Sequence, residues 1–159
     1  MATCPCGSER ADSACCGPIL AGTPAPTALA LMRSRYTAYV RGAVDYLVET
    51  HDATTRGATD RAAIAARARD TLWLGLEIVA TERGGATDDD GVVEFIARGA
   101  LRGVPFAQHE RSRFRRVDGR WRYLDGTAPP FGGAAGRGAP TVDGEAPASG
   151  LRMPPKRSR

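Results

Sequence analysis

The chain has 159 residues, of which 42% are hydrophobic and 25% are charged, enough for one domain with a buried core. No apolar run approaches the roughly 20 residues of a membrane-spanning helix, so the composition excludes a helical membrane protein. The net charge of +4 invites a nucleic-acid-binding interpretation, but five cations and two acidic residues lie in residues 132–159. The remainder is almost neutral, and we expect no specific nucleic-acid binding from it.

All four cysteines lie near the amino terminus, as Cys4, Cys6, Cys15 and Cys16. Two close pairs across a short loop are typical of a structural zinc site, in which four thiolates enclose one ion and leave no position for a reacting water. Gly7 and Gly17 each follow a cysteine. We expect both to adopt positive φ, which would turn backbone amides toward the sulfurs.

Other interpretations of the four thiols stay open. A disulfide within either pair would close a small, strained ring, whereas cross-pairing is geometrically feasible. The chain does not begin with a secretory signal, which predicts a reducing, cytoplasmic location where clustered cysteines more often bind metal. Redox catalysis usually employs C-x-x-C, which is absent, and an iron–sulfur cluster usually has wider spacings.

The segment 17–26 is rich in proline and glycine, and we expect a non-helical linker there. Thr27 then begins an amphipathic helix that ends at Gly42. On that helix, Arg33 and Arg35 are expected to face solvent with buried stems, although Arg33 could instead reach over the rim of a pocket.

Two shorter helices should follow. Asp45 can cap one that runs to about His51, and Thr59 or Asp60 can start another that ends near Asp70. The polar stretch between them, 52–59, is expected to form turns.

Beyond residue 71 the apolar period changes to two, which predicts strands. The predicted strands cover residues 72–80, 92–99, 107–117 and 120–125. A solvated hairpin turn at 84–91 is expected rather than a calcium loop, because its aspartates lack the alternating ligand pattern.

Asp118 and Gly119 form a strong two-residue turn signal, which sets the register of the last hairpin. That register pairs Arg116 with Trp121 and Phe114 with Tyr123. It divides the side chains into an aromatic face, expected to meet the helices, and an arginine-rich face, expected to be wet. The aromatic face holds Glu110, Ser112, Phe114, Arg116, Trp121 and Tyr123; the arginine-rich face holds His109, Arg111, Arg113, Arg115, Arg122 and Leu124.

Three helices before an antiparallel meander indicate an α+β cone, a curved sheet wrapped around helices. Such a cone could enclose a cavity in which Glu110 acts as general base. The candidate pocket residues are Tyr36, Trp73, Glu110, Ser112 and Tyr123. Alternatively, Glu110 pairs with an arginine and is only a satisfied strand residue. His109 belongs to the arginine-rich face and is expected at the surface.

Several motifs resemble the YchJ-like family of bacterial proteins. They are Cys4-Pro5-Cys6-Gly7-Ser8, Cys15-Cys16-Gly17-Pro18, the segment 31–40, Trp73-Leu74-Gly75-Leu76-Glu77 and His109-Glu110-Arg111-Ser112-Arg113-Phe114. The cysteine part is similar to the SEC-C zinc motif found at the end of SecA. The chain departs from the motif at Glu9, where the family usually has glycine, and at Asp12, where it usually has an aromatic residue.

The resemblance implies a zinc knuckle followed by a cone-shaped nuclear-transport-factor-2-like (NTF2-like) domain. The expected boundaries are residues 1–20 for the SEC-C-like module and 27–126 for the cone, with a disordered basic tail over 127–159.

The first functional hypothesis is a non-enzymatic zinc-binding protein that contacts a protein or ribonucleoprotein, since the similar module of SecA contacts a chaperone and the ribosome. The second is an enzyme that binds a small molecule in the cone and uses Glu110 as acid or base. The third is nucleic-acid binding through the arginine-rich face and the tail, which would depend steeply on salt.

Overall fold

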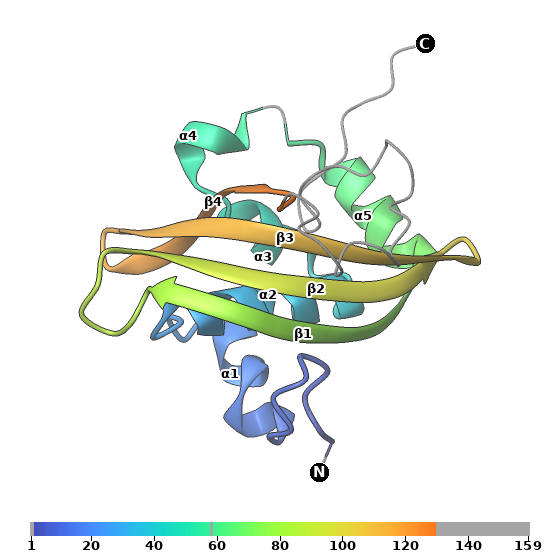
Figure 1. The fold of residues 1–159 in the computed structure, drawn as a ribbon, viewed down its shortest axis with the longest axis horizontal. Helices are drawn as coiled ribbons and strands as arrows, with labels where there is room; N and C mark the ends of the chain where they lie inside the picture. The colour runs from blue at the N-terminus through green and yellow to red at the C-terminus, as the bar shows by residue number, and fades with distance from the viewer. Residues whose placement is uncertain (1, 58, 130–159) are drawn as a thin grey trace.

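The computed structural model describes residues 2–57 and 59–129. Helices come first and an antiparallel meander of four strands follows, in the spatial order β1-β2-β3-β4 (Figure 1). The predicted α+β class is therefore confirmed. The helical segments are η1 (Asp12–Ala14), α1 (Cys16–Leu20), α2 (Ala28–Arg41), α3 (Val44–Glu49), α4 (Ala53–Arg56) and α5 (Arg61–Asp70). The strands are β1 (Thr71–Arg83), β2 (Asp90–Leu101), β3 (Val104–Val117) and β4 (Arg120–Thr127).

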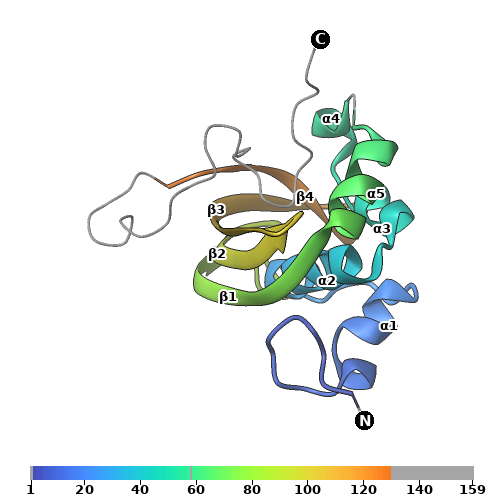
Figure 2. The same cartoon turned by 90° about the vertical axis from the view of Figure 1, so that its right-hand side faces the viewer.

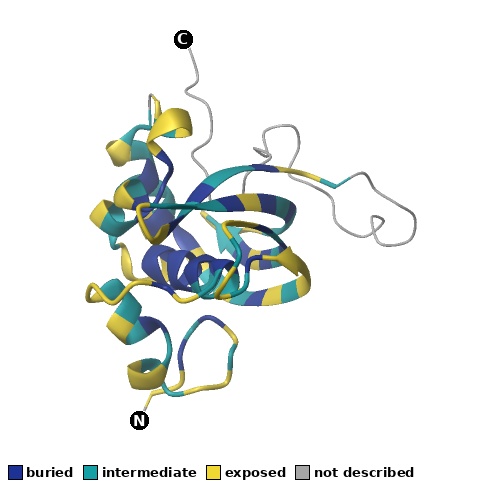
Figure 3. Cartoon of the chain, turned by 90° about the vertical axis from the view of Figure 1, so that its left-hand side faces the viewer, coloured by how far each residue is buried: buried dark blue, intermediate teal, exposed yellow. Residues whose placement is uncertain are grey.

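The sheet curls around α2, while α3 and α5 lie beside it and the amino-terminal loop with α1 lies beneath (Figure 2). Thr27 caps α2 by accepting a hydrogen bond from the Ala30 amide, and Gly42 ends it with a left-handed φ of 71°. Both boundaries agree with the sequence. Because α2 touches the sheet, α1, α3 and α5, it is buried over most of its surface (Figure 3).

The last hairpin has the predicted register, with Phe114 opposite Tyr123 and Arg116 opposite Trp121. Phe114, Trp121 and Tyr123 are each 1% exposed and form the core with residues of β2 and α2. On β2, Val93, Phe95 and Ala97 face inward as the alternation predicts.

Strand β1 departs from simple alternation. Its register against β2 shifts between Trp73 and Gly75, and a one-residue shift moves later side chains to the other face. Trp73, before the shift, points inward against Tyr36 and Tyr39, with ring centroids 5.7 and 5.5 Å away, and the shift brings Leu76 to the same side. Leu74 is left 63% exposed even though Leu76, two residues later, is buried.

Two segments expected to lack helix contain one. Pro18 is the third residue of α1 and lies in the first turn of the helix. Backbone N–H groups there have no acceptor within the helix, so the N–H that proline lacks costs no hydrogen bond. In the segment 52–59, Asp52 caps the short helix α4 by accepting a hydrogen bond from the Thr54 amide. Helix α3 begins at Val44, so that Asp45 lies in its first turn instead of capping it.

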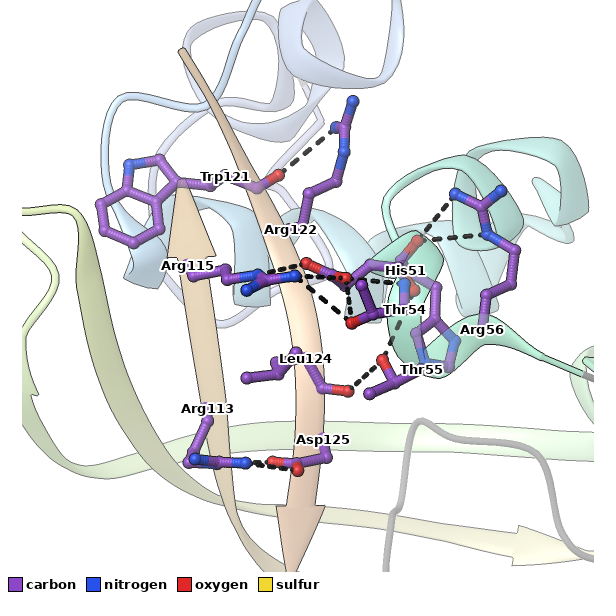
Figure 4. A network of polar contacts seen from close by, with 11 residues as sticks. His51, Thr54, Thr55, Arg56, Arg113, Arg115, Trp121, Arg122, Leu124 and Asp125 are labelled. Atoms are coloured by element: carbon purple, nitrogen blue, oxygen red, sulfur yellow. Dashed lines mark hydrogen bonds and ion pairs between the residues drawn. The ribbon is translucent and has the colours of Figure 1, made fainter. Parts of the chain in front are cut away.

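Helix α4 ties the edge strand β4 to the helical layer (Figure 4). The Asp52 carboxylate, which is only 2% exposed, accepts two hydrogen bonds from Arg115 on the neighbouring strand β3, at 2.6 and 2.9 Å. The Thr55 hydroxyl donates to the Leu124 carbonyl at 2.7 Å, and the Asp52 amide donates to the Tyr123 carbonyl at 2.8 Å. One edge of the sheet is thus covered.

Candidate metal centre

The four cysteine sulfurs converge in the amino-terminal module. The Sγ atoms of Cys4, Cys6, Cys15 and Cys16 all lie within 4.8 Å of one another, and all four thiols are free. A tetrahedral zinc site with bonds of about 2.3 Å has sulfur–sulfur edges of about 3.8 Å. The Cys6–Cys15 and Cys15–Cys16 separations are 3.6 and 4.0 Å, so the donor set fits one tetrahedral ion.

Short backbone contacts bring the two cysteine pairs together. The Cys4 amide donates to the Arg10 carbonyl at 2.8 Å, and Thr3 forms a β-bridge with Ala11. These contacts fold the loop between the pairs into a hairpin. The second pair follows on η1, and Cys16 is the first residue of α1.

The two glycines that follow cysteines have different roles. Gly7 has a φ of 82°, as predicted. Gly17 lies in α1 without positive φ, so that part of the expectation is wrong. Its lack of a side chain matters for packing, because a Cβ atom there would lie 2.8 Å from the Asp12 carbonyl oxygen.

The thiols share hydrogen bonds and burial, which separates their pKa values. Hydrogen bonding from Cys16 lowers the pKa of Cys6 to about 4, whereas sharing that bond with Cys6 raises the pKa of Cys16. Burial raises the pKa of Cys4. One sulfur is therefore predisposed to the thiolate form, and a bound cation would favour the same form for the other three.

Residues of the cone complete the surroundings of the sulfurs. Arg33 on α2 donates from Nη1 to the Cys6 carbonyl at 2.7 Å and lies 3.9 Å from Cys6 Sγ. Thr37, one turn later, lies 3.7 Å from Cys4 Sγ through its hydroxyl. Arg33 is partly exposed, and instead of covering a pocket rim it places its cation beside a cluster that would carry two negative charges with zinc bound.

The two departures from the SEC-C motif acquire structural meaning. Glu9 has a φ of 67°, a left-handed conformation that glycine adopts without strain. Asp12 forms an ion pair with Arg41 at the end of α2, at 3.0 Å. The residue that replaces the usual aromatic side chain therefore links the module to the cone.

The candidate pocket residues form two groups, Tyr36 with Trp73 and Glu110 with Ser112 and Tyr123. Glu110 is 0% exposed and accepts hydrogen bonds from Ser112 at 2.9 Å and Tyr123 at 3.1 Å. A Cβ atom on Gly126 would overlap the Glu110 carboxylate, so backbone also closes over it. Two surface hollows of about 460 and 380 Å³ occur in the described part of the molecule, and neither is lined by these residues. The general-base role of Glu110 stays a prediction that this geometry does not favour.

Arg35 shows where the sequence interpretation was wrong. It is 2% exposed, donates to the Leu47 carbonyl and the Thr50 hydroxyl at 2.9 and 2.6 Å, and lies over the Tyr123 ring at 4.7 Å. Burial lowers the pKa of its guanidinium. Helix α2 carries no continuous polar face, because Ser34, Arg35 and Thr37 are interspersed with apolar residues. That pattern was the available signal that its polar residues are buried too.

Three arginines of the arginine-rich face are paired with acidic neighbours: Arg111 with Glu82 at 2.7 Å, Arg113 with Asp125 at 2.6 Å and Arg115 with Asp52 at 2.6 Å. His109 forms a hydrogen bond with Glu94 at 2.6 Å, and Arg122 donates to the Trp121 carbonyl. Paired charges attract phosphate less than isolated ones. The basic tail lies outside the described residues from 130 onward, and none of the described helices is long and apolar enough to cross a bilayer.

Comparison with known proteins was consistent across sequence and structure. Residues 27–126 match the family described as the YchJ middle NTF2-like domain. A UPF0225 protein from Chromobacterium violaceum is 46% identical over 127 residues, covering 79% of this chain and 92% of that protein. Another from Serratia proteamaculans is 46% identical over 132 residues, covering 81% and 85%.

Two solved structures have the same fold. The solution structure of a SEC-C motif containing protein from Rhodopseudomonas palustris is 39% identical with a TM-score of 0.73, and covers 81% of this chain and 100% of that one. The crystal structure of a SEC-C motif containing protein from Psychrobacter arcticus is 31% identical with a TM-score of 0.70, covering 82% and 84%. This chain therefore belongs to the YchJ-like UPF0225 family of SEC-C motif proteins with an NTF2-like domain.

Proposed function

We propose that the protein is a cytoplasmic zinc-binding interaction protein whose knuckle contacts a protein or ribonucleoprotein. The observation that carries the proposal is the convergence of four free cysteine sulfurs within 4.8 Å. Four soft donors form a closed ligand set, which suits structural zinc and leaves no coordination position for catalysis. Free thiols also suit a reducing compartment.

The knuckle presents a contact surface that the zinc would hold in shape. Gly7, Glu9, Arg10, Ser13 and Pro18 are all exposed, while Cys4, Cys6 and Cys16 are buried beneath them. A segment of this size has no apolar core apart from its sulfurs, so its folding should depend on the ion. The arrangement suits binding through a rigid surface better than catalysis.

Metal analysis of the purified protein tests the zinc part of the proposal. We expect one zinc per chain, lost in Cys15→Ser and retained in the matched control Ser13→Ala, which changes an exposed neighbour. A wild-type protein without stoichiometric zinc would reject the proposal.

Capture from extract tests the partner part. The wild type and Ser13→Ala should retain the same partner, and Cys15→Ser should lose it. Nuclease treatment separates a ribonucleoprotein, whose recovery falls, from a protein, whose recovery does not. Equal recovery by Cys15→Ser would show that the zinc module does not make the contact.

A further inference from the structure

An arginine and three neighbouring side chains form a cluster at the end of the cone beside α5. Arg67 on α5 lies over the rings of Trp73 on β1 and Phe106 on β3, at 5.8 and 5.6 Å from their centroids. Its Nη2 donates to Gln108 Oε1 at 3.1 Å. All four residues are partly exposed, so the cluster lies at the molecular surface, unlike Glu110.

Two donors of this cluster lack acceptors. Within the described residues, the buried nitrogens Arg67 Nε and Trp73 Nε1 have no hydrogen-bond partner, and Arg67 forms no ion pair, in contrast with Arg69 on the same helix, which pairs with Asp70. The charge of Glu110 acts on Arg67 from a distance, but no carboxylate of the described residues contacts its guanidinium, and a guanidinium removed from water without a contacting counter-charge is costly. Buried donors in folded proteins are usually satisfied, so such a pair calls for an acceptor from outside.

The chemistry of the cluster selects one class of acceptor. A planar guanidinium matches the two oxygens of a carboxylate, and one cation without an ion-pair partner suits one negative charge, where a phosphate dianion would need more donors. Aromatic side chains around a few polar groups are typical of sites for small organic molecules. Here Trp73 and Phe106 supply aromatic surface next to the charge.

We propose that this end of the cone binds a small aromatic monocarboxylate, with Arg67 and the Trp73 indole N–H as donors and Phe106 as an apolar wall. The site is separate from the metal centre, and it shares only Trp73 with the pocket expected from the sequence. It does not depend on the proposed role of the knuckle.

Nuclear magnetic resonance on the full-length, zinc-loaded protein tests the site with benzoate as the probe and benzamide as its uncharged analogue. The chain has two tryptophans, and Trp73→Phe assigns their indole N–H signals. Benzoate should shift the Trp73 signal and leave that of Trp121, which is 1% exposed, unchanged. Benzamide should bind at least about tenfold more weakly, because it lacks the charge that pairs with Arg67.

Variants on α5 separate binding from structure. Arg67→Met removes the cation that would bind benzoate and should weaken binding by roughly tenfold or more. The chain should stay folded, because methionine keeps the apolar stem and removes a partly buried guanidinium that has no ion-pair partner. Arg69→Met, two residues away on α5 and already paired with Asp70, should bind benzoate as the wild type does. The proposal is overturned if a millimolar titration leaves the Trp73 signal unmoved, or if Arg67→Met binds benzoate as tightly as Arg69→Met.

Discussion

The knuckle and the cone are stabilised by different means. In the cone, Phe95, Phe114, Trp121 and Tyr123 are at most 1% exposed and form a continuous core with α2. In the knuckle, the buried side chains are Cys4, Cys6 and Cys16, and the proposed zinc would replace the missing hydrophobic burial with sulfur–metal bonds. Helix α2 belongs to both regions, since Arg33 and Thr37 lie against the cysteines from the helix that fills the cone.

Removing the metal should separate the two regions most strongly. Structural zinc supplies about 10–16 kcal/mol of apparent folding free energy to small modules, so chelation should unfold the knuckle. Hydrogen exchange should then show lost protection over residues 4–20 with the sheet still protected. Loss of protection in β2 and β3 at the same chelator concentration would show that the cone also depends on the metal.

Truncation of a core side chain should destabilise the cone and leave the knuckle folded. Phe95→Ala removes a side chain that is 0% exposed and should lower the free energy of unfolding of the cone by about 3–5 kcal/mol. Urea denaturation measures the loss, and Val104→Ala, at a residue 57% exposed, is the control with little effect. Zinc content should stay at one per chain in both variants; parallel loss of zinc in Phe95→Ala would contradict separate stabilisation.

Gly7→Ala should weaken the contact between the regions. A Cβ atom at Gly7 would lie 2.8 Å from the Leu76 carbonyl oxygen of β1, and Gly7 has a φ of 82°. Backbone strain alone costs about 1–2 kcal/mol, and the collision adds to it, so zinc affinity in a chelator competition should fall by about tenfold or more. Gly103→Ala has nearly the same φ, 85°, with nothing within 4 Å, and should leave zinc affinity unchanged. Equal affinities for the two variants would mean that the knuckle does not rely on docking against β1.

Acid should act on the cone through Asp52. Hydrogen bonds from Arg115 hold the pKa of Asp52 well below its ordinary value, so the pair stabilises the folded state at pH above about 3.9, the unfolded pKa of aspartate. That stability is lost as the pH falls below this value. In Arg115→Met, the fall in stability between about pH 5 and pH 2 should be shallower, as measured by denaturation at fixed pH, with exposed Arg120→Met as the control. An unchanged acid profile in Arg115→Met would exclude the pair as a source of stability.

The smallest expected effect is a gain in the knuckle. Glu9→Gly should remove the strain of a residue at a φ of 67° and stabilise the folded knuckle by about 1 kcal/mol. Chelator competition should show a zinc affinity raised by up to about fivefold. A lower affinity would mean that the Glu9 side chain contributes a contact that outweighs its strain.

The sequence by itself determined much of the cone and the identity of the four candidate ligands. Thr27 and Gly42 bounded α2, and the Asp118-Gly119 turn set the register of the last hairpin, because caps and tight turns are specified by a few adjacent residues. The four cysteines also lie close together in the sequence, so their spacing alone indicated a shared site, and their sulfurs do converge.

Only the tertiary structure decided the roles of the arginines and the faces of β1. Arg33 meets Cys6 across 27 positions of sequence, Arg35 is buried beneath Tyr123, and a register shift after Trp73 places Trp73 and Leu76 on the same inward face of β1. These contacts join segments that are far apart in the chain, so no local pattern specifies them. An arginine has the same helix propensity whether its side chain contacts water, a sulfur or an aromatic ring. Which of these it contacts is determined by how the other elements pack around the helix.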